Sequence, residues 1–257
     1  GNVSFGSWEA GYRINTTDNK DGQTEYLTGA LYARHFKVFA DSMRKAAQET
    51  GKTIYIGAVI LEAAPPSWET TTFKNWNAGV IPSAGNTPDY YVIHSYYTPY
   101  NTNSTAAEIL ATGSANTKQM MQYVKQQVQT YGVTEKPVAL DEWNIFAVGS
   151  KQMVSHVSGL HAVSVLSELL KQKYGFASRW DLANAWENGN DHGWFSQGDE
   201  ADGIPKWNPR PAFYHMYFFQ RFLGDKSVAV TSSHTELEAY ASSFTSGQMG
   251  ATLLNTG

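Results

Sequence analysis

Short strand-like runs alternate with helix-like runs through most of this sequence, and this alternation restricts the fold more than any other feature. The predicted strands are residues 3–5, 53–60, 89–94, 136–140 and 181–186. The predicted helices, marked by apolar residues at helical spacing, are residues 26–50, 105–131, 153–170 and 209–222. Neighbouring parallel strands need a long crossover connection, which such helices supply. The sequence therefore predicts an α/β fold built from parallel βαβ units.

The pattern changes after Gly224. Residues 227–231, 236–241 and 249–254 read as three short strands separated by Ser, Gly and Thr turns, with no helical period between them. They indicate the start of a separate antiparallel sheet. We therefore expect an α/β portion over residues 1–224 and a β-rich C-terminal segment over residues 225–257.

The number of strands does not fit a complete α/β barrel. Five predicted strands precede Gly224, whereas a closed (β/α)₈ barrel has eight and typically takes about 250 residues. The chain has 257 residues. Either the α/β portion is a small open sheet, or the chain is part of a longer protein that begins within a barrel and ends within a β-sandwich.

The composition excludes several classes of function. The formal net charge is −4 and no cluster of Lys or Arg is present, so we expect no nucleic-acid partner. No apolar run approaches the ~18 residues of a membrane span. The chain has no Cys, which excludes disulfides and thiolate metal sites. Residues 18–25 match a calcium loop only in part. We therefore expect no metal or cofactor. Its 8 Trp and 15 Tyr residues offer flat amphipathic surfaces that suit sugar rings.

A buried strand that runs directly into a carboxylate is the main candidate for chemistry. Residues 136–140 form a short apolar strand that begins beside Pro137 and is followed by Asp141 and Glu142. At the carboxyl ends of strands in an α/β barrel, an acid is typically catalytic. The alternative is that Glu142 only caps the next helix.

Other strand ends carry polar or aromatic residues as well. Carboxyl ends of parallel strands meet at one rim, so these residues would line one sugar-binding floor. The candidates are Asn2, His94, Tyr96, Trp143, Asn144, Trp186 and Glu187, together with Glu142.

These motifs resemble those of the clan A retaining glycoside hydrolases, which are built on (β/α)₈ barrels and include arabinofuranosidases, xylosidases and agarases. Asp-Glu-Trp-Asn at 141–144 is similar to the strand-seven nucleophile motif, and His-Ser-Tyr-Tyr at 94–97 is similar to strand six. Ala-Trp-Glu at 185–187 is similar to strand eight, and Gly-Asn at 1–2 to the end of strand four. The resemblance implies a partial TIM (β/α)₈-type barrel, strands four to eight, followed by the start of an antiparallel β-sandwich.

The resemblance also implies roles for the candidate residues. Glu142 would be the nucleophile, with His94 and Tyr96 orienting its carboxylate. Asn2 and Asn144 would bind sugar hydroxyls, and Trp186 would stack on a sugar ring.

Val3 departs from the pattern. The motif that follows Gly-Asn places the acid/base Glu where this chain has Val3, and the next acid along the chain is Glu9. A retaining enzyme needs two carboxyls roughly 5–5.5 Å apart, one to attack the anomeric carbon and one to protonate the leaving oxygen. The chain therefore resembles a glycosidase whose proton donor is lost or displaced.

Two functions follow from the sequence. The first is a retaining glycoside hydrolase, arabinofuranosidase-like, that acts on O-glycosyl bonds of a plant or algal polysaccharide, with impaired activity because of Val3. The second is a non-catalytic carbohydrate-binding barrel remnant. In either case we expect an oligo- or polysaccharide partner and a secreted or periplasmic location. We also expect self-association or pairing with a missing barrel half, since half a barrel leaves open sheet edges.

Overall fold

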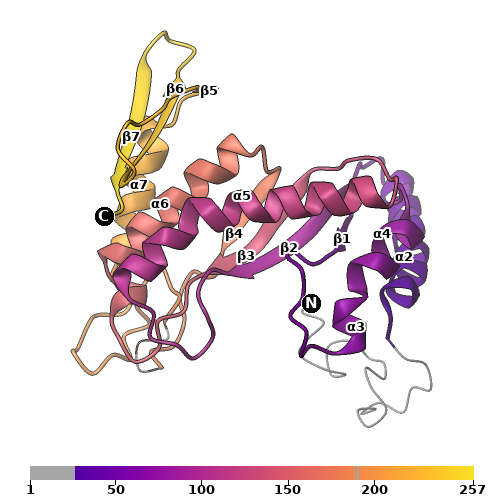
Figure 1. The fold of residues 1–257 in the computed structure, drawn as a ribbon, viewed down its shortest axis with the longest axis horizontal. Coiled ribbons are helices and arrows are strands. Elements are labelled where there is room, and N and C mark those ends of the chain that lie inside the picture. Colours follow the sequence, from indigo (N-terminus) through magenta and orange to yellow (C-terminus); the bar gives the residue numbers. More distant parts are fainter. Residues whose placement is uncertain (1–26, 188, 190) are drawn as a thin grey trace. The chain divides into compact units, whose positions relative to one another are not determined.

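The computed structural model describes residues 27–187, 189 and 191–257 (Figure 1). Four strands form one sheet in the order β1-β2-β3-β4, namely β1 (Gly57–Val59), β2 (Tyr90–Tyr96), β3 (Val138–Asn144) and β4 (Phe176–Arg179). The helices that alternate with them are α2 (Gly29–Glu49), α3 (Thr71–Lys74), α4 (Trp76–Ala84), α5 (Ala106–Thr130), α6 (His156–Lys171) and α7 (Pro211–Phe222), with a short 3₁₀ turn η1 (Gln152–Val154) before α6. The predicted alternation of helices with a parallel sheet is confirmed.

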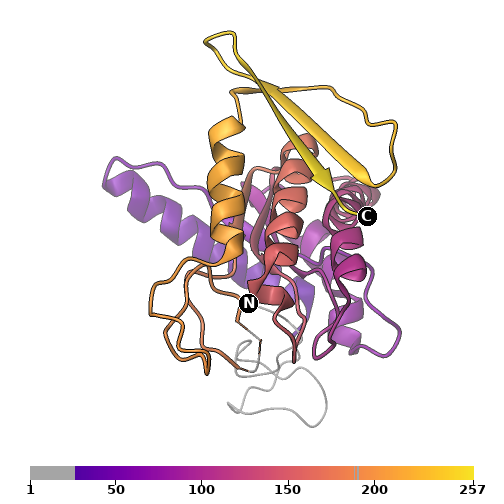
Figure 2. The same cartoon turned by 90° about the vertical axis from the view of Figure 1, so that its left-hand side faces the viewer.

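Three further strands form a separate antiparallel sheet in the order β5-β6-β7. They are β5 (Lys226–Val228), β6 (Leu237–Ser243) and β7 (Met249–Asn255), and Leu237 lies opposite Asn255 across the β6–β7 hairpin. Figure 2 shows this hairpin, in yellow, beside the helices that precede it. The predicted antiparallel segment after Gly224 is thus confirmed, while the division into domains at that residue stays a prediction.

The described chain divides into two compact units, one of residues 27–94 and 120–140 and the other of residues 95–119 and 141–257. In the first unit, Gly57 and Val59 of β1 pair in parallel with Tyr90 and Val92 of β2. Helix α2 packs against α4 at very short range, since a Cβ added at Gly29 would lie 2.3 Å from the carbonyl oxygen of Trp76. Glycine at this crossing permits that close approach.

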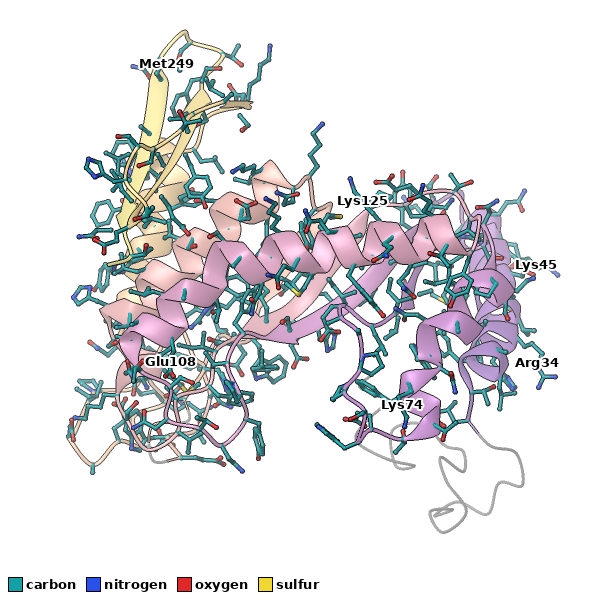
Figure 3. All side chains as sticks on the ribbon, viewed as in Figure 1. Arg34, Lys45, Lys74, Glu108, Lys125 and Met249 are labelled. Carbon is teal, nitrogen blue, oxygen red and sulfur yellow. The ribbon has the colours of Figure 1, made fainter. Side chains whose placement is uncertain are left out.

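Helix α2 shows why the sequence forms this element. Thr28 caps it, and its hydroxyl accepts a hydrogen bond from the Leu31 amide at 3.1 Å. The buried face carries Leu31 and Phe36, among others, while charged side chains such as Arg34 and Lys45 point outwards (Figure 3). The apolar residues at helical spacing that predict this helix include Phe39 and Met43, and both are exposed, so the predicted buried stripe is wrong at these two positions.

The second unit holds α6, α7 and the antiparallel sheet. Glu238 on β6 accepts hydrogen bonds from Ser164 of α6 at 2.6 Å and from Ser114 of α5. Val163, Phe219 and Leu254 form an apolar cluster from α6, α7 and β7. Polar and apolar contacts therefore both attach the sheet to the helices of this unit.

Several strand boundaries differ from those predicted. β2 and β3 extend to Tyr96 and Asn144, so Glu142 lies inside β3 rather than beyond it. The predicted strand over residues 181–186 is wrong, because β4 is Phe176–Arg179 and the later segment makes only one bridge, between Ala183 and Phe195. The predicted strand at residues 3–5 lies outside the described residues.

The predicted strand over residues 181–186 is wrong because tertiary contacts decide where β4 lies. The amide of Trp180 donates to the carbonyl of Trp143 at 3.1 Å, which continues the pairing of β4 with β3. Arg179, the last residue of β4, is buried because its guanidinium finds partners from distant segments. A polar sequence such as Ala-Ser-Arg carries no local strand signal.

In the part of the chain that the structure describes, no helix is long and apolar enough to cross a bilayer.

Candidate active site

The central feature is a hydrogen bond between two strand ends. The hydroxyl of Tyr96, the last residue of β2, donates to Oε1 of Glu142 on β3 at 2.8 Å. Burial raises the pKa of the Tyr96 phenol, and the hydrogen bond to the Glu142 carboxylate raises it further. The phenol therefore stays protonated and acts as the donor, which fixes the orientation of the carboxylate.

Aromatic rings surround this pair. The Tyr96 ring stacks on Phe146, with centroids 4.6 Å apart and planes at 20°. His192 meets both rings edge-on, at 5.4 Å from Tyr96 and 5.3 Å from Phe146. Tyr100 lies edge-on to Phe146 and is 70% exposed. A carboxylate beside flat apolar rings is an arrangement that suits the faces of a sugar.

Asn144 and Trp143 point away from this surface, into the protein. Asn144 is 2% exposed, and its amide nitrogen donates to the carbonyls of Trp180 and His192, while its oxygen accepts from Ile145 and Arg179. These four bonds use the whole hydrogen-bonding capacity of the amide. Asn144 thus holds β3 and β4 in position, and its predicted contact with a sugar hydroxyl stays a prediction.

Trp143 is fully buried and lies edge-on to Tyr97, with ring centroids 6.3 Å apart. Its predicted contact with substrate stays a prediction.

A buried arginine lies beneath the strand ends. Arg179 donates to the His192 carbonyl at 2.9 Å and to Ser158 at 3.1 Å, and its guanidinium lies 5.4 Å from the centre of the Trp194 ring. Burial lowers the pKa of Arg179 to about 10, although nearby Asp181 opposes the shift. Burial and the Arg179 charge also lower the pKa of His192 to about 4, so this imidazole is neutral.

Two residues that the sequence did not single out follow β4. Trp180 is 44% exposed, and its peptide bond to Asp181 is cis. Burial raises the pKa of the Asp181 carboxyl, Arg179 opposes this, and Glu142 adds to it. Both residues were missed because the predicted strand began where β4 had already ended. Because the short strand β4 has no local sequence signal, no pattern in the sequence marks these two positions.

Trp186 and Glu187 lie in a loop instead of at a strand end. The Trp186 amide donates to Asp199 at 2.9 Å, and the Arg210 guanidinium lies 5.8 Å from the centre of the indole ring. Glu187 is exposed. Their predicted sugar contacts stay predictions.

His94 belongs to the first unit, on β2. There it acts electrostatically on Glu62, whose pKa burial raises to about 6. Glu62 follows β1 and was not identified from the sequence. The predicted role of His94 in orienting Glu142 stays a prediction. Asn2, Val3 and Glu9 lie outside the described residues.

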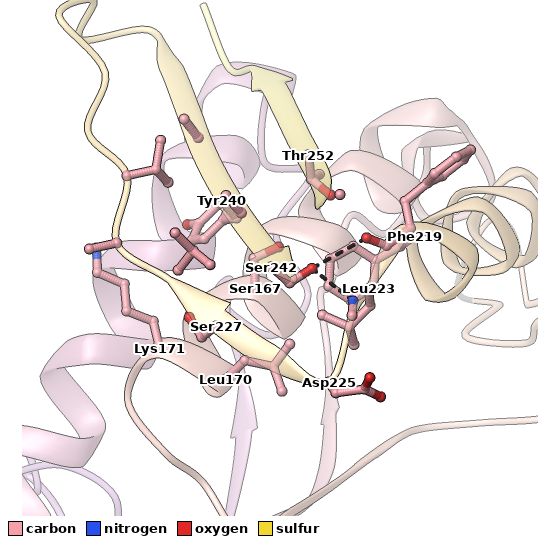
Figure 4. Close-up of a pocket in the computed structure, with 18 of the residues that line it drawn as sticks. Ser167, Leu170, Lys171, Phe219, Leu223, Asp225, Ser227, Tyr240, Ser242 and Thr252 are labelled. Atoms are coloured by element: carbon pink, nitrogen blue, oxygen red, sulfur yellow. Dashed lines mark hydrogen bonds between the residues drawn. The ribbon is translucent and has the colours of Figure 1, made fainter. Parts of the chain in front are cut away.

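Within the described ranges, no three His, Cys, Asp or Glu side chains gather in a way that could hold a metal ion. A cavity of about 610 Å³ does lie between α6, α7 and the antiparallel sheet (Figure 4). Ser242 on its wall accepts a hydrogen bond from the Gly224 amide at 2.8 Å and donates to the Phe222 carbonyl at 3.4 Å. None of the strand-end residues described above is among those that line this cavity.

No protein-family model matches the sequence, and no curated protein matches it significantly. Solved structures do match. An α-L-arabinofuranosidase from Thermotoga maritima, in complex with arabinose, superposes with a TM-score of 0.63 at 19% identity, over 99% of this chain and 50% of that one. A GH51 α-L-arabinofuranosidase from Thermotoga petrophila gives a TM-score of 0.65 at 19% identity, with the same coverage.

The chain shares the fold of part of these structures. A β-porphyranase of glycoside hydrolase family 86 from Bacteroides plebeius also matches, with a TM-score of 0.61 at 19% identity, over 92% of this chain and 43% of that one. The chain spans about half the length of these glycoside hydrolases, which agrees with the predicted partial barrel. At this identity the likeness concerns the fold alone, and the fold prediction is confirmed.

Proposed function

We propose that this chain forms the nucleophile-bearing part of a retaining glycoside hydrolase that cleaves O-glycosyl bonds in a plant or algal polysaccharide. The observation that carries the proposal is the 2.8 Å hydrogen bond from Tyr96 to Glu142 on neighbouring strands. It presents one oriented carboxylate beside the stacked rings of Tyr96 and Phe146. The glycoside hydrolase fold supports the same reaction class, because in such barrels the strand ends carry the active site.

In the proposed reaction Glu142 attacks the anomeric carbon and forms a covalent glycosyl ester, which water then hydrolyses. Tyr96 keeps the carboxylate in one orientation, and this positioning lowers the entropic part of the barrier. The exposed rings of Tyr100 and Trp180 offer stacking surfaces for sugars, and Trp186 is a third candidate. The similar structures are described as acting on arabinofuranosides and porphyran, which supports a polysaccharide substrate.

Covalent labelling tests the nucleophile. A 2,4-dinitrophenyl 2-deoxy-2-fluoroglycoside needs little help from an acid, so it should form a stable ester with Glu142 even where protonation is impaired. We expect mass spectrometry to find the label on the peptide that contains Glu142, for at least one of the arabinofuranosyl, xylosyl and galactosyl reagents. Glu142→Gln should abolish labelling, whereas Glu135→Gln, at an exposed ion pair with Lys125, should not change it. Labelling of another residue, or of none, would refute the assignment.

Val3 favours a second candidate function, that of a non-catalytic carbohydrate-binding protein. Valine cannot give or take a proton, so the position that the resemblance assigns to the acid/base is inert. Calorimetry with oligosaccharides, on the chain and on a Val3→Glu variant, separates the two functions. Turnover gained by Val3→Glu supports an impaired enzyme, and unchanged binding without turnover supports the binder.

Self-association or pairing with a missing barrel half also stays a prediction. Helix α7 exposes Tyr214, Phe218 and Phe222, which are 49%, 57% and 56% accessible. Aromatic side chains on one helix favour burial against a partner. A mass measurement in solution distinguishes a monomer from a dimer of this chain.

A further inference from the structure

Asp181 is a half-buried residue, one of whose carboxyl oxygens is buried without an obvious structural purpose. Its backbone is held firmly, because its amide donates to the His192 carbonyl at 3.3 Å and its carbonyl accepts from the Trp194 amide at 3.1 Å. Its Oδ1 atom, however, is buried and has no hydrogen-bond partner among the described residues. Leaving a buried carboxyl oxygen unsatisfied costs free energy, so such a group invites a functional explanation.

The position of Asp181 brings it to the same strand ends as Glu142. β3 and β4 are neighbours, and the hydrogen bond from the Trp180 amide to the Trp143 carbonyl joins them at the residues adjacent to both acids. Glu142 precedes Trp143, and Asp181 follows Trp180. The two carboxyls also lie near enough to influence each other electrostatically.

We propose that Asp181 is the proton donor of the reaction, an inference that rests on the function proposed above. When Glu142 attacks the anomeric carbon, the bond from that carbon to the leaving oxygen breaks, and its electron pair stays on the oxygen. That oxygen takes the proton of the Asp181 carboxyl, which becomes a carboxylate. In the second half-reaction, this carboxylate accepts a proton from water as the water attacks the anomeric carbon and releases Glu142.

Asp181 would thus replace the acid/base that Val3 does not supply. The resemblance places that acid at the end of another strand, so this role for a residue after β4 depends on the geometry of this chain alone. Two carboxyls whose surroundings separate their protonation states are what the chemistry requires.

The charged and titratable groups around Asp181 favour this role. Burial raises the pKa of Asp181, and the Glu142 carboxylate raises it further, while Arg179 lowers it. Tyr96 is held protonated and His192 is neutral, so neither adds a positive charge. An acid with a raised pKa keeps its proton to a higher pH than an ordinary aspartate does. The rate on substrates that need the acid should then fall as the pH rises through that pKa.

The test compares leaving groups on the 257-residue chain. Asp181→Asn keeps the shape of the side chain but cannot act as an acid. For phenyl glycosides of the sugar that labels Glu142, we expect the variant to lose between roughly 10² and 10⁴-fold in kcat/KM. For 2,4-dinitrophenyl glycosides, the loss in kcat/KM should stay below about 10-fold, because this leaving group departs without a proton. Asp225→Asn is the matched control, since this exposed aspartate accepts hydrogen bonds from the amide and the hydroxyl of Thr245.

A second variant guards against a folding defect. With Asp181→Ala, azide can attack the glycosyl ester in place of activated water, and we expect it to restore turnover of the dinitrophenyl substrate. The product should be a glycosyl azide with the anomeric configuration of the substrate, whereas an azide of inverted configuration would mean that Asp181 is the nucleophile.

The outcomes separate this inference from the function beneath it. If Glu142 is labelled but Asp181→Asn loses the same factor on both leaving groups, Asp181 only binds a sugar hydroxyl and the inference is wrong. An Asp181→Asn variant that keeps the alkaline decline of the wild-type rate also contradicts it. If the wild-type chain is neither labelled nor active, the proposed function fails, and the inference fails with it.

Discussion

Arg210 should contribute several kcal/mol to the free energy of unfolding, because it lies buried between two carboxylates. Its guanidinium is 2.8 Å from Oε1 of Glu200 and also bonds Asp191, and all three side chains are at most 6% exposed. Arg210→Met keeps the length and apolar stem of the side chain but removes the charge. Breaking a buried ion pair from one side typically costs about 3–5 kcal/mol, since the remaining charges stay buried without a partner.

The structure places the expected loss near the lower end of that range, at about 3 kcal/mol. Asp191 would still accept the Gly193 amide at 2.7 Å, and Glu200 would still accept the Ser196 hydroxyl at 2.7 Å. The loss should also depend on pH. Burial already raises the pKa of Asp191, and removing Arg210 raises it more. As the pH falls, Asp191 is therefore protonated more readily in the variant, and the destabilisation becomes smaller. Urea denaturation should therefore show a smaller destabilisation at pH 5 than at pH 8.

An exposed ion pair gives the matched control. Lys151 and Asp202 pair at the surface, with side chains 67% and 51% exposed, so Lys151→Met should change the free energy of unfolding by less than about 1 kcal/mol. Arg210→Met together with Asp191→Asn should recover part of the loss. The reasoning is refuted if Arg210→Met costs no more than Lys151→Met, or if its cost is the same at both pH values.

Three further predictions concern other parts of the molecule. Tyr96→Phe removes the hydrogen bond to Glu142, which contributes about 1.5 kcal/mol. Labelling by the fluoroglycoside should therefore be roughly 10-fold slower. An unchanged labelling rate would contradict the role of the phenol. Burial lowers the pKa of His161 to about 3, so as the pH falls the unfolded chain binds a proton at this residue before the folded chain does. The free energy of unfolding should therefore fall as the pH drops from about 6.5 towards 3. Denaturant titrations should show a flatter pH dependence for His161→Gln, and an unaltered dependence would argue against a buried neutral His161. Gly29→Ala places a Cβ 2.3 Å from the Trp76 carbonyl oxygen and should lower the free energy of unfolding by about 1–3 kcal/mol. Calorimetry measures the change, and a melting temperature equal to that of the wild type would contradict the prediction.

Local sequence was sufficient for the longer helices α2, α5, α6 and α7, whereas α3 and α4 were not predicted. The predicted helix over residues 105–131 is observed as Ala106–Thr130, and that over residues 209–222 as Pro211–Phe222. Helical periodicity and residues such as Gly132, which follows α5, are local signals, and so is a proline at the first position of a helix. The faces of the helices were harder to predict, as the exposed Phe39 and Met43 show, because the surface that a helix buries depends on its neighbours.

The candidate site divides in the same way. Glu142 and Tyr96 could be predicted because Glu142 follows a short apolar run, Tyr96 follows a run of aromatic and β-branched residues, and each belongs to a recognisable motif. Asp181 and Arg179 could not, because β4 is a short strand with a polar sequence. Its buried arginine is stabilised by His192 and Ser158, which lie far from it along the chain.

By itself, then, the sequence determined the alternation of helices and strands, the antiparallel sheet after Gly224 and the acid on β3. Those features depend on periodicity and on turn residues, which act over a few positions. Only the tertiary structure decided where β4 runs, that Asn144 is used inside the protein, and that Asp181, with one buried oxygen that has no partner among the described residues, follows β4 near Glu142. Burial and hydrogen-bond partners depend on residues far apart in the chain, so no local pattern specifies them.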